Sequence, residues 1–332
     1  MPSGFRAEGV GSLREHLVHY YDDDARFGDV AEEHLAAGLA AGERVLAIVT
    51  RPHLRAIERR LETRVDVGAA RASGMLETPD ATRTLELSMV DGSPDPERFR
   101  AHVVRRLADA GRDGTRVRVF GEMVALLWEA GNVTGAIELE DMWNGLLRQV
   151  PFSLLCAYPT TALTRASLAE INQVCHLHTG LVPPLSYAPG PAGVRVHDDH
   201  SDLQSAIFLP VPQAVRATRR FVAEVLESWD LSPIDWDASL VVSELANNAL
   251  RHGASSFRVL VSRTDSGVRV GVHDSSPGRP LRRAAAAEDV DGRGMTIVAA
   301  LSQGWGCEQL GEGKCTWAEL ALPGGPSGGE RR

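Results

Sequence analysis

Two polar side chains, Glu244 and Asn248, lie four residues apart on what the sequence pattern predicts to be one helix. They stand one turn apart beside an apolar stripe, and the helix is expected to begin near residues 235–237 and to end at Gly253. A carboxylate and a carboxamide at the edge of a buried face cost free energy unless they have partners or a function. A solvated helix edge would also explain the pair, so its interpretation depends on residues further along the chain. The stripe comprises Ala238, Val241, Val242, Leu245 and Ala249.

Three further features of the same region could complete a ligand site. Gly292 and Gly294 stand directly before a predicted helix, where glycine lets the backbone approach a ligand and the helix N-terminus attracts an anion. Asp274 ends the second strand of a predicted hairpin over residues 257–273, and a last apolar strand ends near Leu322. Each feature is common by itself. Their order along the chain is the specific signal.

The composition bounds the class of protein. A chain of 332 residues is long enough for about two domains, and 43% hydrophobic with 24% charged residues supplies two ordinary cores. The net charge of -9 argues against a nucleic-acid-binding surface as the main function. No signal-like N-terminus and no long apolar run is present, so we expect a soluble cytoplasmic protein without membrane contact. The four cysteines show no zinc-ligand spacing and are interpreted as small hydrophobic residues in a reducing compartment.

The first half of the chain alternates strand and helix patterns, which is typical of an α/β domain around a largely parallel sheet. Strands are expected at residues 16–21, 44–49, 116–120 and 152–158, whereas residues 64–92 show no firm period. No phosphate-binding loop and no dinucleotide-binding fingerprint is present. Ligands of open α/β sheets bind beyond the carboxyl ends of the strands. The candidates for such a pocket, which would also fit as satisfied core or capping residues, are His16, Tyr21, Glu122, Trp128, Glu140 and Tyr158.

Five segments of this first half resemble a MEDS domain, a bacterial sensory module that is similar in fold to RecA-type ATPases but lacks their phosphate-binding loop. The segments are residues 16–24, 37–46, 119–132, 138–143 and 153–159, and the resemblance covers about residues 12–180. It implies a RecA-like α/β domain over residues 1–180 that acts as a sensory or regulatory input. It does not name the small-molecule ligand.

A linker is expected at residues 181–205, where four prolines and several glycines follow one another. A short run of histidine and aspartate at residues 197–202 is interpreted as solvated rather than as a metal site. Beyond the linker, a helix with apolar positions between Val215 and Leu226 precedes the helix of Glu244. The second domain is expected over residues 206–324, with a tail at residues 325–332.

The order of the C-terminal elements resembles the GHKL, or Bergerat, ATP-binding fold over about residues 206–323. Residues 243–253, which read Ser-Glu-Leu-Ala-Asn-Asn-Ala-Leu-Arg-His-Gly, match the helix motif of the anti-sigma-factor serine kinase branch. Residues 313–317 match the usual ending of that branch. The resemblance implies an α+β sandwich of GHKL type that binds ATP with Mg²⁺.

The resemblance gives each candidate residue a role. Asn248 would bind Mg²⁺ through its amide oxygen, and Glu244 would act as the catalytic base that accepts the proton of an attacking hydroxyl group or water. Asp274 would accept a hydrogen bond from the adenine amino group, and Thr316 would join the polar network around the base. The remaining cofactor-binding candidates are Gly278, Gly292, Arg293, Gly294 and Met295.

Residues near these candidates are expected to have other roles. Ser276 replaces the first glycine of the family's D-x-G-x-G motif; this branch tolerates such replacements, and ATP binding is still expected. His252 is interpreted as a helix cap and Asn247 as a bystander. A mobile lid would contain Arg279, Arg282 and Arg283.

The two resemblances together imply an anti-sigma-factor-type regulator under the control of a sensory domain. It would use Mg-ATP to phosphorylate an anti-anti-sigma protein of the STAS type on serine or threonine, and would sequester a sigma factor when that partner is absent. The alternative is an ATP-binding module that switches partners without phosphoryl transfer. Glu244 argues against this alternative, because binding alone needs no base. The sequence is compatible with a homodimer, and direct binding to nucleic acid is not expected.

A histidine autokinase is disfavoured by the sequence. Such an enzyme needs a phosphoacceptor histidine on a dimerisation helix, typically followed by an acidic residue. No histidine of this chain has that context.

Overall fold

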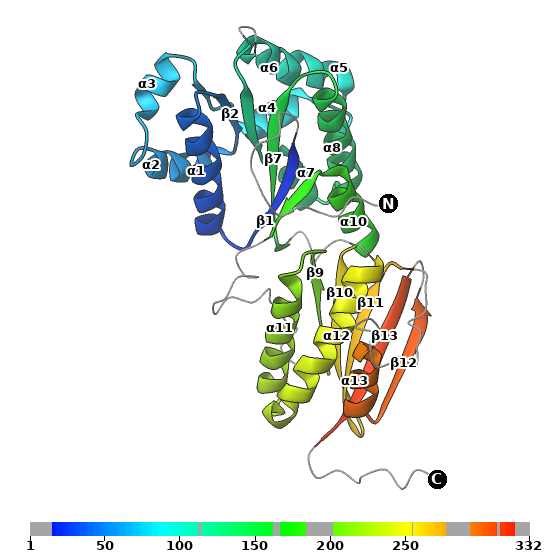
Figure 1. Cartoon of the computed structure of the whole chain (residues 1–332). Coiled ribbons are helices and arrows are strands. Elements are labelled where there is room, and N and C mark those ends of the chain that lie inside the picture. The colour runs from blue at the N-terminus through cyan, green and yellow to red at the C-terminus, as the bar shows by residue number, and fades with distance from the viewer. Residues whose placement is uncertain are drawn as a thin grey trace, which may run out of the picture. The chain divides into compact units, whose positions relative to one another are not determined.

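A computed structural model describes residues 15–111, 114–161, 167–183, 202–253, 255–276, 293–310 and 313–322 (Figure 1). The chain divides into two compact units. The first comprises Met1–Ala166 with Gln173–Leu185, and the second comprises Ser167–Asn172 with Ser186–Arg332.

A six-stranded parallel sheet forms the centre of the first unit, in the order β3-β2-β6-β7-β1-β8. This confirms the predicted α/β class with a largely parallel sheet. A separate two-stranded antiparallel pair, β4 (Met89–Val90) and β5 (Ser93–Pro94), lies outside it. The strands of the large sheet are β1 (His16–Tyr21), β2 (Arg44–Ile48), β3 (Leu76–Glu77), β6 (Val117–Gly121), β7 (Phe152–Pro159) and β8 (Gly180–Val182).

Helices connect these strands and begin at side-chain caps. Asp23 accepts a hydrogen bond from Arg26 N at 2.8 Å, and Asp95 accepts one from Arg98 N at 2.8 Å, which satisfies backbone donors of the first turns. The helices are α1 (Asp24–Ala40), α2 (Arg51–Leu61), α3 (Val67–Ala72), α4 (Ala81–Leu87), α5 (Pro96–Phe99), a π-helical turn (Arg100–Val104), α6 (Arg105–Ala110), α7 (Met123–Glu129), α8 (Val133–Leu147) and α10 (Leu168–Leu177).

The parallel sheet is covered on both faces, with α1 and α2 on one side and α7 and α8 on the other (Figure 1). Successive strand residues point to opposite faces, so the sheet divides the polar candidates. Tyr21 and Leu155 belong to the apolar core under α1 and α2. Tyr20 and Cys156, which are adjacent to them in the strands and point to the opposite face, are almost completely buried as well. Burial of both faces is what a parallel sheet requires.

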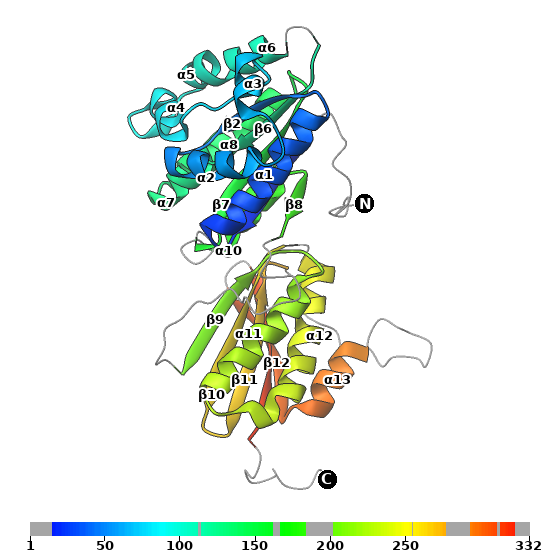
Figure 2. The same cartoon turned by 90° about the vertical axis from the view of Figure 1, so that its left-hand side faces the viewer.

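An antiparallel sheet forms the second unit, in the order β12-β13-β11-β10-β9, and helices cover one face (Figure 2). This confirms the predicted α+β sandwich of the second domain. Alternate residues of β10 are buried toward the helices, including Phe257, Val259 and Val261. The elements are β9 (Leu203–Phe208), α11 (Ala214–Ser228), a 3-10 turn (Ser232–Ile234), α12 (Asp235–Gly253), β10 (Phe257–Thr264), β11 (Gly267–Asp274), α13 (Arg293–Leu301), β12 (Gly304–Leu310) and β13 (Gly313–Ala321).

Several short elements have no counterpart in the sequence-based expectations. The helices α3 and α4 lie in residues 64–92, where no period is visible, because helices this short contain less than two turns of pattern. The strands β8, β9 and β12 are each at the edge of a sheet. An edge strand need not alternate cleanly, since one side of it meets solvent.

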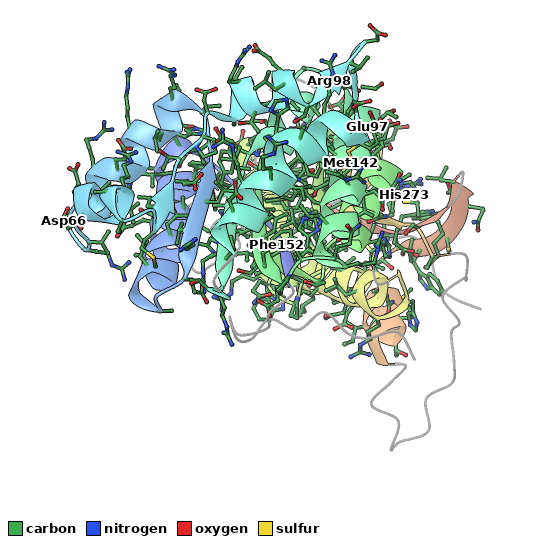
Figure 3. All side chains as sticks on the ribbon, turned by 90° about the horizontal axis from the view of Figure 1, so that it is seen from above. Asp66, Glu97, Arg98, Met142, Phe152 and His273 are labelled. Atoms are coloured by element: carbon green, nitrogen blue, oxygen red, sulfur yellow. The ribbon has the colours of Figure 1, made fainter. Side chains whose placement is uncertain are left out.

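In the first unit, charged side chains lie on the surface and large apolar side chains lie in the interior. Glu97 and Arg98 of α5 are exposed, as is Asp66, whose carboxylate caps α3 (Figure 3). Phe152 at the start of β7 is 1% exposed. Among the helices that the structure describes, none combines the length and the apolar character needed to cross a membrane.

Candidate functional site

The helix α12 positions the first two candidate residues. Its apolar stripe is buried, and Glu244 and Asn248 follow its edge as half-buried side chains one turn apart. Asp235 and Asp237 lie in the first turn and Arg251 in the last, which complements the helix dipole at both ends. The helix therefore presents a carboxylate and a carboxamide side by side without burying either completely.

The start of α13 lies against this pair. A Cβ atom added at Gly294 would overlap Glu244 Oε2 and would stand 3.4 Å from Glu244 Cδ. One residue later, Met295 Sδ accepts a hydrogen bond from Asn248 Nδ2 at 3.4 Å, which leaves the amide oxygen of Asn248 as the atom that could bind a cation. Glycine at position 294 is thus the residue that lets the carboxylate reach the N-terminal turn of α13.

The end of β11 carries the buried carboxylate of Asp274. Its Oδ1 atom accepts hydrogen bonds from Ser276 N at 2.8 Å, from Ser276 Oγ, and from Lys314 Nζ at 3.0 Å. Ser276 replaces the expected glycine, and here it supplies two donors that orient the carboxylate. The hydroxyl group of Ser276, which glycine would lack, therefore helps to hold Asp274 in place through Oδ1, and Oδ2 is the oxygen that a ligand could approach.

Thr316 lies on the same face of the sheet as Lys314 and Asp274. Antiparallel pairing places Asp274 opposite Lys314 and Val272 opposite Thr316. Thr316 is 5% exposed and contacts Cys307 Sγ on β12 at 3.7 Å. Asp274, Lys314 and Thr316 are thus buried polar residues on one face of β11 and β13.

Not every predicted residue can be placed. Gly278 and Gly292 lie outside the described residues, as do Arg279, Arg282 and Arg283 of the expected lid. Arg293 begins α13, but its side chain is outside the described part.

Sequence analysis missed three polar residues near Asp274. Lys314 was noted only as part of a motif, although its buried charge pairs with Asp274. Ser255 Oγ accepts a hydrogen bond from Ser275 Oγ at 2.7 Å. Asn172, which belongs to the second unit, accepts one from Ser256 N at 2.7 Å. The presence of a lysine in an otherwise buried strand pattern was the one available signal, because lysine is rarely buried unless it is paired.

The six polar candidates of the first unit separate into two groups. Glu122 lies just beyond β6, where its carboxylate accepts a hydrogen bond from Thr50 N and contacts His53 Nδ1 at 2.5 Å. Burial disfavours the charge on His53, but the hydrogen bond and charge of Glu122, together with Asp24, outweigh it and raise the pKa of His53. Tyr21 lies beside His53, with ring centroids 6.3 Å apart. This group is at the carboxyl ends of the strands, as predicted for a ligand site.

The second group lies within the other face of the sheet. Tyr158 Oη donates a hydrogen bond to Glu140 Oε1 at 2.7 Å, and His16 Nε2 lies 3.1 Å from Glu140 Oε2. Trp128 packs edge-on against Tyr158. The structure thus brings four of the six candidates together in one buried group, His16, Trp128, Glu140 and Tyr158.

The arrangement in the second unit offers groups that can bind a metal ion and an anion. An amide oxygen is a suitable ligand for Mg²⁺, and a neighbouring carboxylate can take a proton. The N-terminus of α13 offers unpaired backbone donors to an anion.

Comparison with known families agrees with this division of the chain. Residues 15–179 match the family described as MEDS, the MEthanogen/methylotroph, DcmR Sensory domain. Residues 208–320 match the family described as Histidine kinase-like ATPase domain. No curated protein matches the chain. The first match contains both polar groups of the first unit, and the second contains the residues around Glu244 and Asp274.

Proposed function

We propose that this chain, a regulatory ATP-binding signalling protein in which a MEDS sensory domain precedes a GHKL-type histidine kinase-like ATPase domain, is a protein serine/threonine kinase. Its substrate would be an anti-anti-sigma protein of the STAS type. In the absence of that partner it would sequester a sigma factor.

One observation carries the proposal of transfer rather than of binding alone. The carboxylate of Glu244 lies against Gly294 in the first turn of α13, one helical turn from Asn248. A base at the N-terminus of a phosphate-binding helix is where an incoming hydroxyl group would meet the terminal phosphate. Pure nucleotide binding would gain nothing from a second negative charge beside the phosphates.

The chain's residues would divide the reaction as follows. Asn248 would hold Mg²⁺, which when bound would neutralise charge on the phosphates. Glu244 accepts the proton of the substrate serine or threonine while its oxygen bonds to the γ-phosphorus and the bond to the β-phosphate oxygen breaks. ADP is the leaving group. Asp274 accepts a hydrogen bond from the adenine amino group and so selects the base.

The MEDS domain would supply the regulatory input. Its candidate ligand contact is the Glu122 and His53 pair at the carboxyl ends of β2 and β6. A small polar molecule there would exchange hydrogen bonds with a carboxylate and an imidazole. The fold alone does not specify that molecule.

Transfer of label from radioactive ATP to a cognate anti-anti-sigma protein tests the proposal with the full-length chain. We expect Glu244→Gln to reduce labelling by about 100-fold or more while ATP binding is retained, as for loss of a general base. Glu227→Gln, at an exposed position of α11, is the matched control and should label normally. Tight ATP binding without transfer to any partner tried would leave the partner-switch alternative standing instead. Co-purification with sigma factors in the presence and absence of that partner tests sequestration.

A further inference from the structure

Four side chains that can bind a metal ion converge inside the first unit. They come from β1, α8, β7 and the segment between α10 and β8, and all four are buried, with exposed fractions between 0% and 6%. Their ligand atoms all lie within 4.8 Å of one another. The group, called here the His-Glu-Cys-His cluster, comprises His16, Glu140, Cys156 and His178.

The distances within the cluster have the size of the edges of a coordination shell. His16 Nε2 lies 3.1 Å from Glu140 Oε2 and 3.3 Å from Cys156 Sγ. Cys156 Sγ lies 3.5 Å from Glu140 Oε2, and His178 Nε2 lies 3.4 Å from Oε1, the other oxygen of the same carboxylate. With Zn–N bonds of about 2.0 Å and Zn–S bonds of about 2.3 Å, neighbouring ligands of a tetrahedral site stand about 3.3–3.6 Å apart.

The hydrogen bonds outside the cluster fix which ring nitrogen of each histidine faces inward. Asn144 Nδ2 donates to Leu177 O at 2.7 Å, so the amide oxygen of Asn144 is the atom that faces His16 Nδ1 at 3.0 Å. His16 must therefore carry a proton on Nδ1. His178 Nδ1 likewise donates to Val174 O at 2.7 Å. Both neutral rings then direct the lone pair of Nε2 into the cluster, the orientation in which histidine binds metals.

The hydrogen bond that Cys156 Sγ donates to Glu140 Oε2 does not satisfy every inward-facing atom of the cluster. Among the described residues, His178 Nε2 is buried and has no hydrogen-bond partner. It faces a carboxylate oxygen, which is also an acceptor. Two acceptors in contact within a protein interior are unfavourable unless a proton or a cation lies between them.

We propose that the His-Glu-Cys-His cluster binds one divalent transition-metal ion of the zinc type. Two imidazole nitrogens, one thiolate and one carboxylate oxygen suit Zn²⁺, whereas Mg²⁺ and Ca²⁺ take oxygen ligands. The surroundings provide the outer contacts that such sites need. Asn144 and the carbonyl of Val174 orient the two imidazoles, and Tyr158 orients the carboxylate.

The position of the cluster indicates what the metal would do. Four protein ligands with no exposed side close the coordination shell, as in structural rather than catalytic zinc sites. The ion would join β1 and β7 in the middle of the sheet to α8 and to the segment before β8. Occupancy would then contribute directly to the stability of the MEDS domain.

Metal analysis of the full-length protein tests the proposal. We expect one zinc ion per chain after purification in the presence of zinc, and a thiolate-to-cobalt charge-transfer band when cobalt replaces it. Cys156→Ser should remove that band and lower the bound metal at least about tenfold. Cys175→Ser and His19→Gln are matched controls, because both positions are buried in the same unit but lie outside the cluster.

The main rival is a buried imidazolium that pairs with Glu140 without any metal. It predicts a chain whose melting temperature responds neither to added zinc nor to a strong chelator. We expect the chelator to lower the melting temperature of the wild-type chain and to have no effect on Cys156→Ser. These measurements on the wild-type chain remain decisive even if a variant fails to fold. Failure to take up zinc or cobalt, or an unchanged cobalt spectrum in Cys156→Ser, would overturn the proposal.

Discussion

Asp274 and Lys314 form a buried ion pair at directly opposed positions of β11 and β13. Their charged atoms are 3.0 Å apart, and the residues are 3% and 4% exposed. Ser276 adds two donors to the same carboxylate oxygen. The proposed base-recognition carboxylate is thus charged, oriented and supported before any nucleotide binds.

Lys314→Met should strongly destabilise the ATPase domain. The substitution leaves the carboxylate of Asp274 buried without a compensating charge, a change that costs about 3–5 kcal/mol in other proteins. Urea unfolding of the full-length chain measures the effect. Glu86→Gln is the control, since it removes one partner of an exposed ion pair with Arg83 and should change stability little. Recovery in the double variant Asp274→Leu/Lys314→Met would show that the lost pairing, rather than the lost lysine stem, is responsible.

Gly294→Ala should impair phosphoryl transfer more than ATP binding. The new Cβ atom would overlap Glu244 Oε2, so the carboxylate must move. A displacement of about 1 Å can cost about 100-fold in rate. Gly304→Ala is a matched control, because a Cβ atom there would contact nothing within 4 Å. Single-turnover labelling and ATP binding should be compared; equal losses in the two variants would argue against a specific contact at position 294.

Asn248→Ala should remove the Mg²⁺-dependent part of the ATP affinity. The amide oxygen of Asn248 is the proposed metal ligand, whereas the amide nitrogen contacts Met295. Titration of ATP with and without Mg²⁺ by calorimetry gives the difference directly, which we expect to fall by about tenfold or more. Asn247→Ala, the adjacent half-buried residue, should behave like the wild-type chain. An unchanged Mg²⁺ dependence in Asn248→Ala would remove the metal assignment.

Acid should destabilise the MEDS domain through two histidines whose pKa values the fold lowers. Burial and the Arg118 guanidinium lower the pKa of His34 to about 3, against a hydrogen bond to Val119 O, and burial lowers that of His19 to about 4, against one to Val182 O. Both values are below the 6.5 of an unfolded histidine, so the unfolded state binds the proton first. This contribution to stability is present above pH 6.5 and is lost as the pH falls toward 3.

The change of the free energy of unfolding with pH is measurable. Each histidine should contribute about 1.4 kcal/mol per pH unit between its folded and its unfolded pKa. In urea unfolding at several pH values, His34→Gln should reduce the pH dependence by about that amount, because glutamine can still donate to Val119 O but does not titrate. His252→Gln, at an exposed position of α12, should leave the slope unchanged. The same slope in all three proteins would contradict the assignment to His34.

The sequence alone determined the local parts of the ATP-binding domain. The spacing of Glu244 and Asn248 follows from the helical period, and Asp274 ends a strand whose alternation is visible over the whole hairpin. The parallel sheet of the first unit was equally evident, since buried apolar runs alternate with helices. These features depend on interactions between residues that are near one another in the chain.

Only the tertiary structure decided which distant residues meet. Pairing of β11 with β13 brings Lys314 to Asp274 across 40 positions, and pairing of β1 with β7 brings His16 to Cys156 across 140. The register of strands joined by long connections is set by packing of the whole domain rather than by local pattern, and a shift of one residue would turn each side chain to the other face. For this reason the cysteines showed no zinc-ligand spacing in sequence, although Cys156 lies beside two histidines and a glutamate in the fold.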